Sequence, residues 1–264
     1  MKKQLGVRVN KMFTHYRTQG FIFKKTDRGE YDRIFTVYTK DFGKLELLAK
    51  SERKINSKLR NGLELFYLSD IEFIQGKGYK TLTDVAVINN FKGIRNDFGK
   101  LVLVFKISNV LDSLINGQEL DLKIWGLLQE TFERINNSET PGKIIYYYFL
   151  WSLFSILGYR PDLYFCSACH KKIVPHKIYF NFKAGGVICG SCSKSFAEKD
   201  SFAPPLDETP AVEEKEISQN TIKIIRIILK NEWDVLEKLK VDEEDLRLLK
   251  IFSKQYCMET LRKI

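Results

Sequence analysis

The 264-residue chain has few of the residues that enzymes use for acid–base or metal chemistry. Its only three histidines are His15, His170 and His176, and none lies in an H-x-E or HExxH motif. No Ser-His-Asp or Cys-His arrangement is visible, and the G-x-x-x-x-G-K-[ST] spacing of a phosphate loop does not occur. These absences argue against a hydrolase, a metalloprotease or an ATPase.

Long hydrophobic runs are missing too. The longest apolar stretch, residues 144–157, is too short to cross a bilayer and contains Ser152 and Ser155. The first eight residues carry charge but no apolar segment, which is not the pattern of a signal peptide. Hydrophobic residues still make up 44% of the chain, enough to build folded cores. We therefore expect a cytoplasmic protein without a membrane partner.

Cysteine is scarce, but four of the five cysteines form a metal-binding pattern. Two C-x2-C pairs are separated by 19 residues, a spacing typical of zinc sites, and consist of Cys166, Cys169, Cys189 and Cys192. Four thiolates fill the tetrahedral shell of one Zn²⁺ ion and leave no position for water, so we predict a single structural zinc. The alternatives are two buried or redox-active pairs, or a site in which His170 or His176 replaces a cysteine.

The positive charge of the chain is concentrated near its start. The formal net charge is +10, and residues 1–60 alone carry 16 Lys and Arg against 6 Asp and Glu. An excess of one sign at this density repels itself, which favours an anionic partner. Nucleic acid is the first candidate for that partner, and an anionic membrane surface is the second.

Periodicity predicts strands first and helices afterwards. Five short strands rich in β-branched and aromatic residues, with a basic insertion at residues 50–60, favour a closed barrel of the OB kind over an SH3-like barrel. A helix from Thr140-Pro141 to Gly158 is apolar on nearly every side and is expected at the centre of a helical domain. Further helices are predicted at residues 217–239 and 242–261.

These patterns predict an α+β protein in which a five-stranded OB-fold barrel is followed by an all-α domain carrying a zinc-ribbon-like lobe. We expect the following parts: a basic N-terminal extension at residues 1–15, a nucleic-acid-binding barrel at 16–90, a helical domain at 91–162 and 197–264, a zinc-binding lobe at 163–196 inserted in it, and an acidic, proline-containing linker at 202–216.

Basic residues on the second strand of the barrel, its turns and the insertion form the predicted DNA-binding surface: Arg33, Lys40, Lys44, Lys50, Arg53, Lys54, Lys58 and Arg60. OB-folds bind single strands through a cationic groove and aromatic faces on which bases stack. A barrel also needs aromatic residues for its core, and we expect Phe35 to pack inside. Tyr38 and Phe42 are the candidates for base stacking.

Several short stretches follow one another in a distinctive order: GEYDRI at 29–34, FGKL at 42–45, LELF at 63–66, GKG at 76–78, TLT at 81–83, LGYRP at 157–161 and GGVIC at 185–189. Together with the two CxxC pairs, their order and spacing resemble the RecO family of bacterial DNA repair and recombination mediators over residues 16–192. The chain departs from the family pattern in its basic extension, in Glu52, which dilutes a basic stretch, and in Asn181-Phe182 before the second cysteine pair.

The resemblance implies an OB barrel, a helical domain, a zinc lobe and a non-enzymatic role in the RecF pathway at the bacterial nucleoid. Such a protein would bind single- and double-stranded DNA, anneal complementary strands and, with RecR, help to load RecA onto DNA coated by single-strand-binding protein. The acidic, apolar C-terminal tail of single-strand-binding protein is expected to bind the helical domain. The residues alone also allow an RNA-binding protein of translation or RNA processing, whereas a zinc hydrolase lacks a base to activate water.

Overall fold

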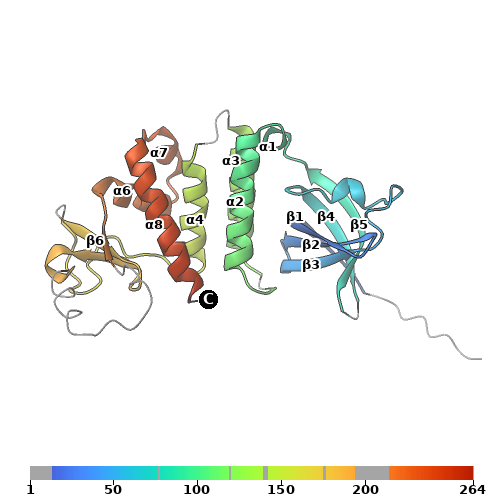
Figure 1. Ribbon diagram of the computed structural model, residues 1–264, viewed down its shortest axis with the longest axis horizontal. Helices are drawn as coiled ribbons and strands as arrows, with labels where there is room; N and C mark the ends of the chain where they lie inside the picture. Colours follow the sequence, from blue (N-terminus) through green and yellow to red (C-terminus); the bar gives the residue numbers. More distant parts are fainter. Residues whose placement is uncertain are drawn as a thin grey trace, which may run out of the picture. The chain divides into compact units, whose positions relative to one another are not determined.

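The computed structural model describes residues 14–76, 78–118, 120–138, 142–174, 177–193 and 214–263. The chain divides into a barrel unit, Met1–Asn96 with Ile115–Trp125, and a helical unit, Asp97–Leu114 with Gly126–Ile264 (Figure 1). None of the helices within the described ranges is long and apolar enough to cross a lipid bilayer.

Some sequence predictions fall outside the described residues. These are most of the basic extension, at residues 1–13, the predicted helix start at Thr140-Pro141, the candidate ligand His176, and residues 202–213 of the acidic linker.

Five strands form a closed barrel in the order β1-β2-β3-β5-β4. Their bounds are β1 (His15–Arg28), β2 (Asp32–Thr39), β3 (Gly43–Ala49), β4 (Leu68–Gln75) and β5 (Lys80–Asn89). All neighbouring strands are antiparallel except β3 and β5, which pair in parallel. The predicted five-stranded barrel, with its insertion between β3 and β4, is confirmed, and this architecture is that of an OB-fold.

Strand β1 closes the barrel because it pairs along its length with two partners. Gly20 lies opposite Thr39 of β2 and also opposite Ser69 of β4. A Cβ atom at Gly20 would lie only 2.5 Å from Val37 Cγ1, so the absence of a side chain allows β1 to cross the core closely. The register of β1 against β2 shifts between Ile22 and Lys24, just past Phe21, where the pairing of β1 with β4 ends.

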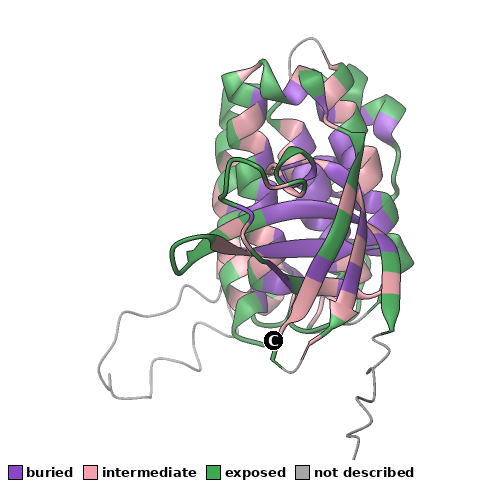
Figure 2. Cartoon of the chain, turned by 90° about the vertical axis from the view of Figure 1, so that its right-hand side faces the viewer, coloured by how far each residue is buried: buried purple, intermediate pink, exposed green. Residues whose placement is uncertain are grey.

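Side chains of the strands fill the barrel. Figure 2 shows long buried segments along these strands. The completely or almost completely buried core includes Ile22, Phe35, Val37, Leu45, Leu47, Ile71 and Phe73. Phe35 is fully buried, as predicted. The inward side chains on β2 and β3 lie two positions apart, so the residues between them face outward and are available for other contacts.

Residues Ile115–Trp125 belong to the barrel unit although residues 97–114 of the helical unit separate them from the rest of it in sequence. Trp125 packs against Phe21 of β1 with ring centroids 5.2 Å apart. The backbone oxygen of Ile115 accepts a hydrogen bond from Lys44 Nζ at 3.0 Å. These contacts cover outward-facing residues of β1 and β3.

The helical unit is built around one apolar helix. Helix α4 (Ile144–Ile156) contacts α2 (Phe98–Leu114), α6 (Gln219–Leu229) and α8 (Glu243–Leu261). Its Trp151 is fully buried, donates a hydrogen bond from Nε1 to Ser253 Oγ at 2.9 Å, and stacks on Tyr256. The predicted central, buried helix is therefore confirmed. The unit also contains most of α3 (Leu122–Asn137), whereas the short α1 (Lys92–Arg95) belongs to the barrel unit.

The prediction of a single helix at residues 217–239 is wrong. The structure has two helices there, α6 and α7 (Trp233–Lys238), separated at Asn231, which adopts a left-handed conformation with φ of 57°. Helix α8 begins where it was predicted, because the side chain of Asp242 accepts a hydrogen bond from the backbone N–H of Asp245.

The cysteine-containing lobe holds a small sheet in the order β7-β6-β8. Its strands are β6 (Ile178–Asn181), β7 (Gly186–Cys189) and β8 (Glu214–Glu216), the last of which was predicted as linker. Phe180 and Phe182 pack against Phe252 of α8. The lobe therefore shares an aromatic core with the helices and does not depend on a metal alone for its packing.

Candidate metal centre and nucleic-acid interface

The four predicted ligand cysteines come together at one point. The sulfur atoms of Cys166, Cys169, Cys189 and Cys192 all lie within 4.8 Å of one another. The Cys169 and Cys189 sulfurs are 3.9 Å apart. A tetrahedron with Zn–S bonds of about 2.3 Å has sulfurs about 3.8 Å apart, so the spacing fits a zinc-sized ion. These four cysteines can therefore hold one metal ion.

Local backbone structure positions both cysteine pairs. The first pair lies on a tight turn in which the N–H of Cys166 donates to Lys171 O and the N–H of His170 donates to Cys166 O, both at 2.9 Å. His170 takes a left-handed φ of 58° and is exposed, outside the sulfur cluster. The second pair begins at the end of β7, where the N–H of Cys189 points at Cys166 Sγ at 3.4 Å.

The surroundings favour thiolates at two of these positions. The backbone N–H of Cys192 and nearby side chains lower the pKa of Cys189 to about 6. Burial raises the pKa of Cys166, but hydrogen bonds from three backbone N–H groups outweigh it and the net shift is downward. The pKa of Cys192 is raised, mainly by its hydrogen bond to Cys189. Four sulfurs this close repel one another as thiolates, so they can all ionise only when a cation lies between them. A metal site has this property.

The donor set defines what such a site can do. Within the described residues no histidine or carboxylate joins the sulfur cluster, so a bound ion would be surrounded by sulfur alone. A metal with four thiolate ligands has no open position for water or substrate. The arrangement therefore suits a structural metal rather than a catalytic one.

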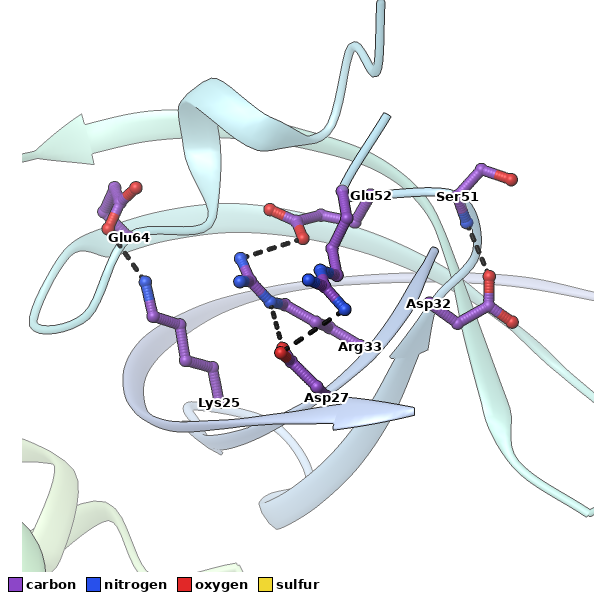
Figure 3. Close-up of polar contacts among 8 residues, drawn as sticks. Lys25, Asp27, Asp32, Arg33, Ser51, Glu52 and Glu64 are labelled. Carbon is purple, nitrogen blue, oxygen red and sulfur yellow. Dashed lines mark hydrogen bonds and ion pairs between the residues drawn. The ribbon is translucent and has the colours of Figure 1, made fainter. Parts of the chain in front are cut away.

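On the barrel, one predicted DNA-binding arginine is committed to an internal ion network. Arg33 Nε donates to Asp27 at 2.6 Å, and Arg33 Nη1 donates to Glu52 at 3.2 Å (Figure 3). Arg53 adds a second cation to Asp27 at 3.4 Å. Glu52 is only 2% exposed, so the pair with Arg33 fastens the insertion to β2.

Further contacts hold the insertion in one conformation. Ser51 takes a left-handed φ of 54°, and its N–H donates to the Asp32 carboxylate at 2.7 Å. The N–H of Arg53 donates to the backbone oxygen of Tyr31 at 3.0 Å. The Lys54 ammonium lies 4.9 Å from the centre of the Tyr31 ring. The insertion is thus an ordered loop whose remaining basic side chains are exposed.

The structure separates the eight predicted DNA-binding residues into two groups. Arg33 and Lys44 are partly buried and bonded to neighbouring groups of the barrel unit. The others are exposed: Lys40, Lys50, Arg53, Lys54, Lys58 and Arg60. Five of those six lie on or directly before the insertion, so the accessible charge is concentrated there.

The aromatic predictions fare differently. Tyr38 is 1% exposed and its hydroxyl donates to the backbone oxygen of Asp121 at 3.3 Å; this burial contradicts the stacking prediction and raises its pKa to about 12. Phe42 is half-buried, with its ring edge-on to Phe73 of the core. The exposed ring beside the basic insertion is Tyr31, at 44%, which we missed although its place after the Gly29-Glu30 turn indicated exposure.

The helical unit contains a groove that sequence reasoning did not find. It has a volume of about 870 Å³ and lies among α2, α4 and α8. Its apolar lining includes Val102, Leu103, Tyr146, Tyr147, Leu150 and Leu246, and its basic residues are Lys106, Lys143, Arg247, Lys250 and Lys254. Glu243 is the one acidic residue that lines it among the described residues. A groove with these walls suits an acidic peptide with apolar side chains.

An OB-like barrel, a helical unit and a four-thiol cluster together are the architecture of a multidomain protein of the nucleic-acid-handling kind. Residues 12–91 match the family described as Recombination protein O N terminal, and residues 95–263 match Recombination protein O C terminal. The chain therefore belongs to the Recombination protein O, or RecO, family, and the resemblance drawn from short motifs is confirmed.

Curated relatives match over most of their length. The chain is 30% identical to a protein of Dehalococcoides mccartyi over 236 residues, which are 89% of this chain and 87% of the relative. It is 31% identical to one of Thermodesulfovibrio yellowstonii over 94% of both chains. It is 26% identical to one of Acetivibrio thermocellus over 94% of this chain and 93% of the relative. All three relatives carry the name DNA repair protein RecO.

Proposed function

We propose that this protein is a non-enzymatic mediator of DNA repair and recombination that binds single- and double-stranded DNA on its barrel and anneals complementary strands. The observation that carries this proposal is the basic insertion of the barrel: an ion network anchors it and five cations at its surface remain exposed, namely Lys50, Arg53, Lys54, Lys58 and Arg60. Cations on a fixed loop can contact several phosphates at once without first losing the entropy of ordering that loop.

The RNA-binding alternative uses the same cations and the same fold. Membership of the RecO family supports DNA as the natural partner. Competition between DNA and RNA strands of one sequence separates the two, and tighter binding of the RNA strand would favour the alternative.

We propose that the four cysteines hold one Zn²⁺ ion. Sulfur donors at tetrahedral spacing support zinc over the oxygen-seeking Mg²⁺ and Ca²⁺. When bound, zinc would hold the two turns together, while the residues of the barrel contact DNA.

We further propose that the groove among α2, α4 and α8 receives the acidic, apolar C-terminal tail of single-strand-binding protein. Charge complementarity supports this occupant, because five basic residues surround an apolar floor that includes Leu150 and Leu246. On this proposal the protein acts in the cytoplasm at the nucleoid and, together with RecR, helps RecA to replace single-strand-binding protein.

The DNA-binding proposal is tested by removing three exposed lysines of the insertion, Lys50→Gln, Lys54→Gln and Lys58→Gln, in one variant. For single strands, each lost phosphate contact reduces the magnitude of the slope of log affinity against log salt by about 0.7. The slope of the variant should therefore be shallower by about 2. Fluorescence anisotropy of a labelled oligonucleotide over a sodium chloride series measures that slope.

The matched control changes three exposed lysines elsewhere to glutamine, Lys123, Lys238 and Lys240, and so removes the same total charge. We expect this control to keep most of the wild-type slope. Equal losses in both variants would show that only net charge matters and would overturn the assignment of the site to the insertion.

A further inference from the structure

Exposed aromatic rings and basic side chains occur together where the chain enters the cysteine lobe. Tyr164 is 41% exposed and Phe165 is 48% exposed, and both directly precede the first ligand cysteine. Four basic residues lie in the same region, namely Arg160, Lys171, Lys172 and Arg226. We call these six residues the knuckle platform.

The guanidinium of Arg226 organises one side of the platform. It lies 4.3 Å from the centre of the Tyr164 ring, and Nη2 donates to the backbone oxygen of Leu163. Arg226 Nε is buried and has no hydrogen-bond partner among the described residues. Beside it, Arg160 and Arg226 line a hollow of about 280 Å³. This hollow is therefore bordered by two cationic side chains and an aromatic ring.

The charges of the platform are not neutralised from within. In the part of the chain that the structure describes, no ion pair joins Arg160, Arg226 or the two lysines to a carboxylate. Among the described residues, the carboxylate that lines the hollow is that of Asp162, and its Oδ1 accepts hydrogen bonds from the N–H groups of Tyr164 at 2.8 Å and Phe165 at 3.1 Å. The platform thus offers positive charge to an outside anion.

Backbone hydrogen bonds fix the chain segment that carries the two rings. The N–H of Ile173 donates to Tyr164 O at 2.9 Å, and Phe165 pairs with Lys172 in an antiparallel bridge. The N–H of the next residue, Cys166, donates to Lys171 O, and its sulfur belongs to the four-cysteine sulfur cluster. A segment whose backbone is already ordered loses less entropy on binding than a free loop would.

We propose that the knuckle platform is a second binding site for a single nucleic-acid strand. Cations that contact phosphates and aromatic faces that stack on bases are the combination by which single strands are held without sequence preference. On the barrel, most of the aromatic rings beside the cations are buried, as Tyr38 shows, whereas two rings are exposed here. An acidic peptide could pair with the cations, but its apolar side chains would find no groove beside the two exposed rings.

The inference rests on the proposed function and extends it. Annealing requires one protein to hold two complementary strands, or two segments, at the same time. With one site on the basic insertion of the barrel and one on the platform of the helical unit, a single chain can carry both. The saturated protein therefore binds two short oligonucleotides, and the platform is the weaker site because it has fewer exposed cations.

The test combines Arg160→Gln, Phe165→Ala and Lys172→Gln, which remove exposed groups and leave Arg226 and its backbone contact intact. The stoichiometry of a labelled twelve-nucleotide strand should fall from two to one per chain, and the annealing rate should fall about tenfold or more, because stacking and charge are lost together. The affinity of the first, barrel-bound strand should not change. Crosslinking of an iodouracil-substituted strand to the peptide containing Tyr164 or Phe165 would add direct support.

Controls keep the outcome interpretable. Val174→Ala, at a 68% exposed position of the same lobe, should leave stoichiometry and annealing at wild-type levels, and the zinc content of every variant should equal that of the wild type. If the triple variant disturbs the lobe, Arg160→Glu alone provides a second test, because this side chain is exposed. Wild-type stoichiometry and annealing in both variants would overturn the platform.

The result also distinguishes this inference from the proposed function. If one strand binds the barrel normally and no strand binds the platform, only the inference about the platform is overturned. If the insertion variant and the platform variant both bind strands as tightly as the wild type, the proposed function itself is contradicted. Displacement of the strand from the barrel only, combined with saturable binding of a polyglutamate peptide at the platform, would assign the platform to an acidic protein.

Discussion

At the scale of single residues, the barrel uses some of its positive charges for structure and leaves others exposed. Arg33 bridges Asp27 and the buried Glu52, whereas the side chains of Lys50 and Lys58 are exposed. A buried carboxylate costs several kcal/mol unless it is paired, so Arg33 cannot leave Glu52 to contact a phosphate without destabilising the insertion. The glutamate that departs from the family pattern thereby anchors the loop.

Replacing Arg33 by glutamine should lower the free energy of unfolding by about 2 kcal/mol, because Glu52 loses its cation and Asp27 loses a charged hydrogen bond. Hydrogen-exchange mass spectrometry should place the loss in the insertion and β2. Lys50→Gln, the control, should change stability by less than about 0.5 kcal/mol. An Arg33 variant as stable as this control would contradict the anchoring role.

The same variant has a signature in pH. The hydrogen bond from Arg33 lowers the pKa of Asp27 in the folded protein. A lowered pKa means that this contact stabilises the fold above the unfolded-state pKa of Asp27 and loses its effect as pH falls through the folded value. A carboxyl NMR titration should show the pKa of Asp27 rising towards its ordinary value in the Arg33→Gln variant.

At the scale of elements, the cysteine lobe is supported in two independent ways. The sulfur cluster joins the turn at residues 166–170 to the end of β7, and Phe180 and Phe182 join β6 to α8. The first support needs a metal and the second does not. Loss of metal should therefore loosen the two turns more than the sheet.

Chelation of zinc, or Cys166→Ser, should destabilise the lobe, since structural zinc contributes on the order of 10 kcal/mol in small zinc domains. We expect increased hydrogen exchange at residues 164–172 and loss of the second strand, while binding of the first strand to the barrel persists. Acidification should have the same effect, because protons compete with zinc for thiolates. Cys257→Ser, outside the cluster, is the control, and loss of all DNA binding from an otherwise folded protein would contradict the prediction.

At the scale of the whole molecule, exposed cations gather on two surfaces. On the barrel insertion they form the proposed DNA site, and in the helical unit basic residues surround an apolar groove. On our proposal the first group binds a polyanion, and the second binds an acidic peptide whose apolar side chains enter the groove. Salt should weaken DNA binding strongly and peptide binding less, since buried apolar area is not screened.

Reversal of two groove charges, Lys250→Glu and Lys254→Glu, should weaken binding of an acidic, apolar peptide about tenfold or more. Isothermal titration calorimetry with a peptide that carries the C-terminal sequence of single-strand-binding protein measures the change. Lys238→Glu with Lys240→Glu reverses the same charge outside the groove and should bind the peptide nearly as well as the wild type. Equal weakening in both variants would remove the groove from the proposal.

Local patterns predicted much of this protein. The cysteine spacing indicated the sulfur cluster because a short hairpin between the two C-x2-C turns brings their four sulfurs within a few ångströms of one another. Alternation of side chains predicted the barrel and the burial of Phe35, and the apolar faces of residues 144–157 predicted the central position of α4. In each case the deciding interactions lie within one strand, hairpin or helix, where the period of the backbone sets the direction of the side chains.

Tertiary structure alone decided which predicted residues stay accessible. Tyr38 points out of the barrel, as alternation requires, but residues 115–125, far along the chain, cover it. The groove combines α2, α4 and α8, and the knuckle platform combines Arg226 with Tyr164, which 61 intervening residues separate. Accessibility depends on long-range packing, and a pattern of neighbouring residues carries no information about which distant segment will cover a side chain.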